Sequence, residues 1–312
     1  MSDARIVLFG GSGFVGSNLC KYLNADMIVP KENEADLTRL DSLRQVINPG
    51  DIVINAAGYA NATDTTEKGK AIFQAVNVDG MRNLAEASRD KGAAQLIHIS
   101  SVAAMGKWHR EGVTEEMLKP VNSPYAASKR AGEEVLFEYM DTIPITILRP
   151  TSVFGEGRGL ARTLFRLVSK GTVPIPGSGS ALIPFTYIGN IARCVELAIG
   201  NDNCYGRTFI VGDENSYSLS DILFEIGNAL GVKVKLVKIP VGLCQVCVRF
   251  FEAAAMLHNR SPLFDSGRLD TLTTSVSYSI SMFRSATQYQ QPFTFQESVR
   301  RIAVWYMDEI NK

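Results

Sequence analysis

Tyr125 and Lys129 carry the strongest chemical signal in this sequence, because they stand at positions i and i+4 directly after Pro124. A proline suits the first turn of a helix, and the i, i+4 spacing places both side chains on one helix face. A phenol with a pKa of about 10 is a poor base at neutral pH, but a nearby ammonium favours the phenolate. The spacing therefore predicts a general acid/base. The alternative is an ordinary amphipathic helix, which the glycine loop upstream and a predicted strand ending in Ser100 and Ser101 disfavour.

A glycine-rich loop near the start of the chain is the second chemical signal. Gly10, Gly13 and Gly16 follow an apolar run and precede a helical pattern. In this context the first glycine permits a tight turn, the second lets backbone amides approach a pyrophosphate, and the third allows close helix–strand packing. The N-terminus of the helix favours the negative charge. We expect a dinucleotide to contact Gly10, Ser12, Gly13, Phe14, Val15 and Gly16.

Two further segments fit the same pocket. Asp36 and Leu37 lie in a short loop, where the carboxylate can accept a hydrogen bond from an adenine amine, although an Asp in this position also suits a helix N-cap. Ala56, Ala57 and Gly58 end the third predicted strand with small side chains, so a flat cofactor can lie against the backbone there.

The choice of cofactor depends on the end of the second predicted strand, at Lys31. The strand end offers no acidic residue for the ribose 2′-hydroxyl, whereas Lys31 can pair with a 2′-phosphate. This favours NADP over NAD and leaves both open. NADP points to a reductase that exchanges its cofactor, and NAD to an epimerase that retains it.

These residues require a doubly wound α/β fold to position them. Short apolar runs without polar alternation are typical of buried parallel strands, and here they alternate with helical patterns. The predicted strands are Arg5–Phe9, Met27–Val29, Asp51–Asn55, Gln95–Ser100 and Ile145–Leu148. The predicted helices between them are Phe14–Leu23, Leu40–Ile47, about 70–91 and Pro124–Met140.

The regular alternation ends after Pro150, which indicates a second, smaller lobe. We expect a Rossmann domain over residues 1–155, with returning segments at about 186–212. A C-terminal substrate-binding lobe is then formed by about 156–185 and 213–312. Ligands of open α/β sheets bind at the carboxyl ends of the strands, so this lobe is expected to cover that edge. Helical patterns return at Asn190–Ile199, Leu219–Leu230, Val241–Leu257 and Phe295–Ile310.

Several motifs in order resemble the extended short-chain dehydrogenase/reductases, also known as the NAD-dependent epimerase/dehydratase family. They are GGSGFVG, the Asp-Leu pair, INAAG, AVNVDGMRNL, HISSVAAMG, SPYAASK, ILRPTSVFGEG and FTYIGN. The resemblance implies hydride transfer at a carbinol carbon, with Tyr125 as acid/base, Lys129 binding the nicotinamide ribose and Ser101 polarising the substrate oxygen. It implies further cofactor contacts at Ser100, Asn77, Pro150 and Val153.

The sequence departs from this family at several positions. Val102 and Ala103 follow Ser101 where dehydratases of the family carry Asp-Glu, so dehydration is not expected. Ile183 and Pro184 precede the Phe185–Tyr187 motif where nucleotide-sugar enzymes often carry an arginine. Arg158 and Arg162 can supply a substitute phosphate contact, or they are solvated helix charges. The expected substrate contacts are therefore Ser101, Tyr125, Ser152, Arg158 and Tyr187.

The segment Val241–Leu257 is a helical pattern that is apolar apart from Gln245, Arg249 and Glu252 on one face. The pattern favours a core helix or one that closes the lobe. A helix on a membrane surface, or over a lipid tail, is the alternative. The surrounding C-terminal motifs resemble epimerases acting on polyprenyl-diphosphate-linked sugars, and also hydroxysteroid dehydrogenases.

Charge and cysteine content exclude several other classes. Lys+Arg and Asp+Glu balance at 32 each, which disfavours nucleic-acid binding, and the five cysteines show no metal-ligand spacing. An N-terminus that enters a strand at once predicts no signal peptide, hence a cytoplasmic protein with peripheral contact to the inner face of the membrane as an option. The resemblance further implies a homodimer through the Pro124–Met140 and 70–91 helices.

The leading hypothesis is a 4-ketoreductase or 4-epimerase that acts on a nucleotide- or lipid-diphosphate-linked sugar. One alternative is a hydroxysteroid-type or other small-molecule alcohol dehydrogenase. Another is a scaffold that senses NAD(P) without turnover, which would have no use for Tyr125, Lys129 and Ser101.

Overall fold

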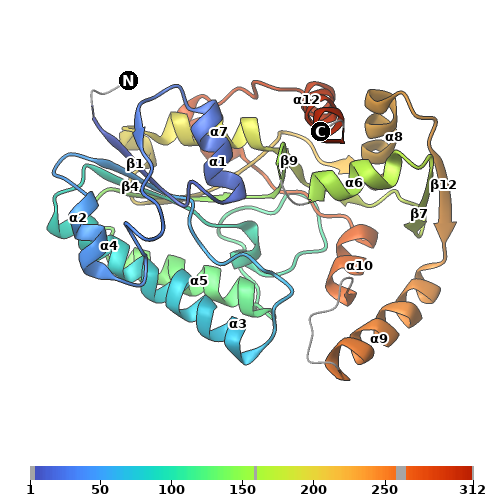
Figure 1. Cartoon of the computed structure of the whole chain (residues 1–312), viewed down its shortest axis with the longest axis horizontal. Coiled ribbons are helices and arrows are strands. Elements are labelled where there is room, and N and C mark those ends of the chain that lie inside the picture. The colour runs from blue at the N-terminus through green and yellow to red at the C-terminus, as the bar shows by residue number, and fades with distance from the viewer. Residues whose placement is uncertain (1–3, 158–159, 258–264, 311–312) are drawn as a thin grey trace.

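A six-stranded parallel sheet forms the centre of the protein in a computed structural model that describes residues 4–157, 160–257 and 265–310 (Figure 1). The strand order is β10-β5-β4-β3-β1-β2, so the chain reverses direction across the sheet between β1 and β3. Such a reversal leaves a crevice at the carboxyl ends of the two strands, where ligands of open α/β sheets bind. The strands are β1 (Ile6–Phe9), β2 (Met27–Ile28), β3 (Ile52–Asn55), β4 (Gln95–Ile99), β5 (Ile145–Pro150) and β10 (Arg207–Val211).

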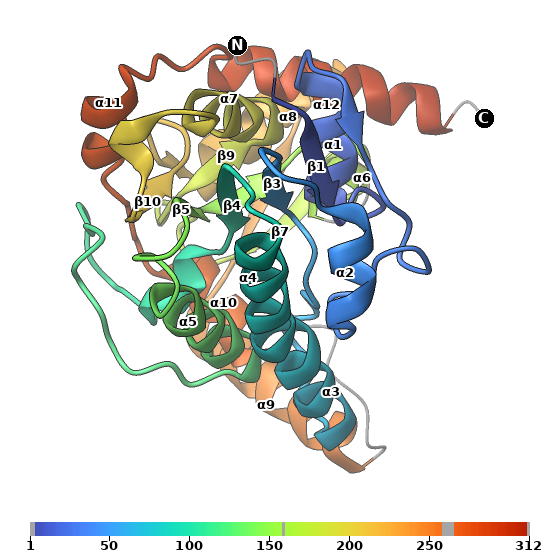
Figure 2. The same ribbon diagram turned by 90° about the vertical axis from the view of Figure 1, so that its left-hand side faces the viewer.

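Helices cover both faces of the sheet, which confirms the doubly wound α/β fold (Figure 2). Successive residues of a strand point to opposite faces. Ile6 and Leu8 therefore pack into one core with α1 (Phe14–Tyr22) and α7 (Ile188–Ala198), and Val7 and Phe9 pack into the other core. The second core also contains α2 (Leu40–Val46), α4 (Gly80–Asp90) and α5 (Pro124–Phe137).

The predicted long helix at 70–91 is divided into three pieces. These are α3 (Glu67–Ile72), a π-helical segment η1 (Phe73–Asp79) and α4. Single wide turns of this kind occur often at functional sites. Gly80 follows the π-helical segment, and a β-carbon there would lie 3.0 Å from the side chain of Leu37. The irregular turn thus coincides with a close approach of the helix to the predicted adenine-binding loop.

The second half of the chain adds small two-stranded sheets and helices beside the main sheet. Helix α8 (Leu219–Leu230) packs against α6 (Leu160–Val168) and α12 (Phe295–Ile310).

Strand β10, helix α6 and the small strands were not among the predicted elements. The remaining elements are β6 (Ser152–Phe154), β7 (Thr172–Pro176), β8 (Leu182–Ile183), β9 (Phe185–Tyr187), β11 (Tyr217–Ser218), β12 (Lys235–Ile239), α9 (Val241–Leu257), α10 (Ser266–Thr273) and α11 (Ser281–Thr287), with 3-10 turns at Val102–Met105 and Asp202–Cys204.

Helix α9 has the predicted bounds but not the predicted burial. Val248 is buried, whereas Leu243, Val246, Phe250 and Phe251 are exposed. The expectation of a core helix is therefore wrong, because α9 packs against α10 along one side and exposes large apolar side chains on the other (Figure 1). The expectation of a helix that closes the lobe stays a prediction. Within the described residues, no helix combines the length and the apolar character needed to cross a membrane.

We expect Gly16→Ala to lower the free energy of unfolding by about 1–3 kcal/mol, the usual cost of overpacking a tight contact. A β-carbon at Gly16 would lie 2.1 Å from the carbonyl oxygen of Gly10, which cannot move without displacing the loop. Urea denaturation followed by circular dichroism measures the change. The matched control is Gly242→Ala, because no atom lies within 4 Å of that β-carbon. If both variants were equally stable, the tight packing of the loop would be contradicted.

Candidate functional site

The glycine loop is packed tightly against the end of β3. Gly10 has a φ of +84°, and a β-carbon on it would lie 2.4 Å from the backbone nitrogen of Ala57. Gly13 N donates to Gly10 O at 2.9 Å, which closes the turn that leads into α1. Only glycine adopts this backbone without strain, and it also permits the contact with Ala57. The structure thus brings the predicted loop and the predicted small residues of β3 together.

The N-terminus of α1 fits a bound anion. Gly13 is the N-cap residue and gives the helix no side-chain cap, and the first turn of α1 carries no acidic residue. By contrast, the hydroxyl of Ser123 accepts a hydrogen bond from Ala126 N and so caps α5. Unpaired amides and the helix dipole make the start of α1 suitable for a pyrophosphate. Ser12 is exposed here, while Phe14 and Val15 are half-buried.

The predicted adenosine-binding residues lie on the loop after β2. Lys31 is exposed, and its backbone amide bonds to the Glu34 carboxylate at 2.9 Å. One carboxylate oxygen of Asp36 accepts hydrogen bonds from the amide and hydroxyl of Thr38, both at 2.8 Å. These contacts form a local turn, and Asp36 does not cap α2, whose N-cap residue is Arg39. Leu37 is buried, and its carbonyl accepts from Asn83.

Asn77 joins the loop after β3 to α5. Its amide exchanges two hydrogen bonds with the backbone of Tyr59, at 2.8 and 2.9 Å, and donates to Ser128 Oγ at 3.0 Å. A β-carbon on the adjacent Gly58 would lie 3.1 Å from Asn77 Oδ1 and 3.7 Å from Lys129 Nζ. Asn77 therefore joins the loop after β3 to α5 through its side chain.

Tyr125 and Lys129 lie on α5 as predicted, beside the end of β4. Burial raises the pKa of the Tyr125 phenol, and a hydrogen bond with Ser101 acts in the opposite direction. Lys129 is buried and donates to the carbonyl of Ile99 at 3.1 Å. Burial lowers the pKa of Lys129 to about 8, while Glu133 acts in the opposite direction. Tyr125, Ser101 and Lys129 thus form one group at the carboxyl end of β4.

A buried ion pair between α5 and β5 lies next to this group. Arg149 of β5 donates to the carboxylate of Glu133 on α5, with Nη2 at 2.7 Å and Nε at 3.0 Å. Ser100 Oγ donates to the same carboxylate. Arg149 Nη1 also donates to the carbonyl of Glu115 at 3.1 Å. Paired donors of this kind fix the orientation of a carboxylate as well as its charge.

The segment after β5 holds the remaining predicted contacts. Pro150 ends β5 in a buried position, and Ser152 and Val153 open β6 in half-buried positions. Tyr187 is fully buried, and its hydroxyl lies 2.6 Å from Glu156 Oε1 and 2.5 Å from the Tyr22 hydroxyl. It has no surface that a substrate can contact, so Tyr187 supports the packing of β9 on α1. Arg158 lies outside the described residues.

A profile of the NAD dependent epimerase/dehydratase family matches residues 6–212, about two thirds of the chain. This chain belongs to that family. The matched segment contains the glycine loop, the Ser101–Tyr125–Lys129 group and all six strands of the main sheet. The protein is therefore an NAD(P)-binding enzyme of the oxidoreductase/epimerase type, with a function of the sugar epimerase/dehydratase kind.

Relatives in this epimerase/dehydratase family match nearly the whole chain. The N-acetyl-alpha-D-glucosaminyl-diphospho-ditrans,octacis-undecaprenol 4-epimerase of Escherichia coli O157:H7 is 24% identical, over 96% of this chain and 94% of its own. The UDP-glucose 4-epimerase of Vibrio cholerae is 26% identical, over 98% and 97%. The structure of RMD from Pseudomonas aeruginosa complexed with NADPH superposes with a TM-score of 0.76 at 20% identity, over 98% of this chain and 99% of that one. These matches confirm the fold.

Sequence reasoning missed the residues that hold the catalytic group in place. Glu133 could have been found, because it continues the i, i+4 series from Tyr125 and Lys129 along one face of the helix. Arg149 and Ser128 gave no such signal, since their partners lie on other elements of the fold.

We expect Lys129→Met to raise the free energy of unfolding of the cofactor-free protein at pH 7 by a few kcal/mol. Below pH 8 the folded protein holds a buried ammonium, and an unfolded lysine binds its proton more tightly. The wild type therefore recovers stability as the pH rises from about 8 towards the unfolded lysine pKa of about 10.4. Denaturant titrations between pH 7 and pH 10 should show the difference shrinking. A difference that stayed constant over this range would contradict a depressed pKa for Lys129.

Proposed function

We propose that this enzyme is a 4-epimerase or 4-ketoreductase that acts on a sugar linked to a nucleoside or lipid diphosphate. The observation that carries the proposal is the buried Lys129, whose ammonium donates to the carbonyl of Ile99 at the end of β4, on the same helix face as Tyr125 and beside Ser101. It lies on the edge of the sheet that also holds the anion-binding start of α1. The two relatives described above bear names of 4-epimerases, which supports position 4 of a hexose as the reacting carbon.

The proposed mechanism assigns each polar side chain one role. Ser101 donates a hydrogen bond to the substrate oxygen at the reacting carbon and orients it. Tyr125 exchanges the proton of that oxygen as it interconverts between hydroxyl and carbonyl. Lys129 lies one helical turn away and carries a positive charge below about pH 8, which favours the phenolate. A bound nicotinamide supplies the hydride acceptor or donor.

The sequence between β8 and β9 weakens an ordinary nucleotide-sugar assignment. The uncharged Ile183 and Pro184 precede Phe185 where an arginine often grips a nucleotide diphosphate in this family. The name of the E. coli relative supports a lipid-diphosphate carrier. Val102 and Ala103 leave the 3-10 turn after Ser101 without an acidic group, which disfavours dehydration.

The proposed organisation divides the chain by function. Residues 1–155 with about 186–212 bind the cofactor, and about 156–185 with 213–312 bind the substrate. The inclusion of β10 in the main sheet supports the returning segment. The proposed assembly is a homodimer through α5 and the α3–α4 segment, which lie side by side on one face of the molecule (Figure 2).

We expect Tyr125→Phe to lower turnover by at least about 10²-fold, because the ring remains but the proton carrier is removed. The assay follows interconversion of UDP-glucose and of N-acetylglucosaminyl-diphospho-undecaprenol with their 4-epimers, and NADPH oxidation with the 4-keto forms. Tyr139→Phe is the matched control, since that hydroxyl contacts Glu86 on the surface helices. Near-normal turnover in Tyr125→Phe would overturn the assignment. Absence of turnover in the wild type, with sterol or other alcohols as better substrates, would favour the alcohol dehydrogenase alternative.

We expect Lys31→Ala to weaken NADP binding about ten- to hundredfold and to leave NAD binding nearly unchanged, because an ammonium–phosphate hydrogen bond is lost. Lys31 is exposed on the loop after β2, where the adenosine ribose of a dinucleotide would lie. Calorimetric titration with both cofactors measures the ratio, and Lys170→Ala on the opposite lobe is the control. An unchanged NADP/NAD ratio would mean that Lys31 is a solvated loop residue and does not read the 2′-phosphate. NAD that co-purifies tightly with the wild type would favour the epimerase over the reductase.

A further inference from the structure

Helix α9 presents a continuous apolar surface to solvent. Its members are Leu243, Val246, Phe250 and Phe251, with exposed fractions of 56%, 66%, 73% and 57%. We call these four residues the apolar stripe. They recur at intervals of three, four and one residues, which places them on one side of the helix. Large apolar side chains gathered in this way on a soluble protein mark a surface that binds another apolar surface.

The opposite side of α9 is attached to the protein, so the outward direction of the stripe is fixed. Val248 is 3% exposed, and the carboxylate of Glu252 accepts hydrogen bonds from the amide and hydroxyl of Ser266 at 2.7 and 2.8 Å. Val248 and Glu252 are one turn apart and face away from the stripe. The acidic group of the helix is therefore directed into the fold, at the start of α10.

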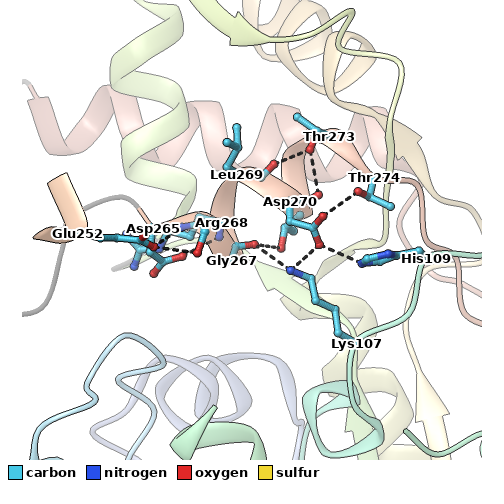
Figure 3. Close-up of polar contacts among 12 residues, drawn as sticks. Lys107, His109, Glu252, Asp265, Gly267, Arg268, Leu269, Asp270, Thr273 and Thr274 are labelled. Atoms are coloured by element: carbon cyan, nitrogen blue, oxygen red, sulfur yellow. Dashed lines mark hydrogen bonds and ion pairs between the residues drawn. The ribbon is translucent and has the colours of Figure 1, made fainter. Parts of the chain in front are cut away.

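Helix α10 is in turn held by the loop after β4 (Figure 3). Asp270 of α10 lies 2.5 Å from Lys107 Nζ and 3.0 Å from His109 Nε2, and its other oxygen accepts from Thr274. Asp265 caps the first turn of α10 by accepting from Arg268 N at 2.7 Å. These contacts tie α9, through α10, to the segment that follows Ser101.

Positive charge lies directly before the stripe. Lys233, Lys235 and Lys238 are exposed on β12 and the turn that precedes it, and Arg249 is exposed on α9 itself. Residues 231–255 hold these four cations and a single acidic residue, Glu252, which is bonded to Ser266. Strand β12 leads straight into α9 at the edge of the molecule (Figure 1). The segment that carries the stripe is therefore basic and has no exposed carboxylate of its own.

We propose that the apolar stripe of α9 docks on an anionic lipid bilayer, with Phe250 and Phe251 inserted at the level of the headgroups. An exposed apolar helix face bordered by lysine and arginine is the pattern of a helix that lies in the plane of a membrane interface. The lysines of β12 then contact anionic headgroups. A second copy of this chain would bring the same basic border against itself, which like charges oppose. The docking does not depend on which sugar the enzyme transforms.

The test is sedimentation of the full-length protein with vesicles, without substrate or cofactor. Phosphatidylcholine vesicles that contain phosphatidylglycerol are compared with vesicles of phosphatidylcholine alone. We expect the wild type to prefer the anionic vesicles. Phe250→Ser combined with Phe251→Ser should weaken binding by about tenfold or more, since burial of a phenylalanine is lost. Lys235→Gln and Lys238→Gln should each weaken it about fivefold on the anionic vesicles.

Phe224→Ser on α8 is the matched control, because it removes a phenylalanine that is 45% exposed outside the stripe, and it should bind vesicles as the wild type does. Thermal unfolding checks that every variant is folded. Equal binding of the double variant and the wild type, or no preference for anionic lipid, would overturn the proposal. So would a change of oligomeric state in the double variant by light scattering, which would assign the stripe to a second copy. Tyr125→Phe should bind vesicles normally, so a failed assignment of catalysis is distinguishable from a failed docking surface.

Discussion

The buried ion pair between Glu133 and Arg149 is the interaction on which the arrangement of Tyr125, Ser101 and Lys129 depends. It joins α5 to β5, and Ser100 connects it to the end of β4. Arg149 also holds the backbone of Glu115, whose own carboxylate accepts from Ile210 N of β10 at 2.9 Å. Four elements thus meet at two opposite charges that are both removed from water. Loss of either partner would leave an unpaired buried charge, which is among the costliest changes a fold can suffer.

The same carboxylate influences the chemistry, because Lys129 lies one turn before Glu133 on α5. Burial disfavours the ammonium and lowers its pKa to about 8, while the negative charge of Glu133 opposes that shift. Near neutral pH the lysine therefore remains protonated at a cost to stability. The proposed role of Lys129 gives a reason for this cost, because a site removed from water strengthens the effect of a charge on the groups around it.

The glycine loop and helix α9 both depart from ordinary packing, but in different ways. At the sheet edge, glycines let backbone approach backbone, and the amides at the start of α1 have no side-chain partner on their own helix. At α9, large apolar side chains remain in solvent although polar groups are satisfied internally. The first arrangement suits a charged ligand. The second suits an apolar surface outside the chain, and both are local departures from ordinary packing.

The sequence by itself determined the elements whose pattern is local. The glycine spacing, the buried strands of the first half and the Tyr125–Lys129 helix follow from short-range periodicity, and the bounds of α8, α9 and α12 were predicted without error. The short strands were missed because their pairing partners lie far away in the chain. Tyr187 could not be recognised as fully buried, since its partners Tyr22 and Glu156 come from other elements. The exposure of α9 was decided only by tertiary structure, because the sequence pattern of an apolar helix is the same whether or not other elements cover it.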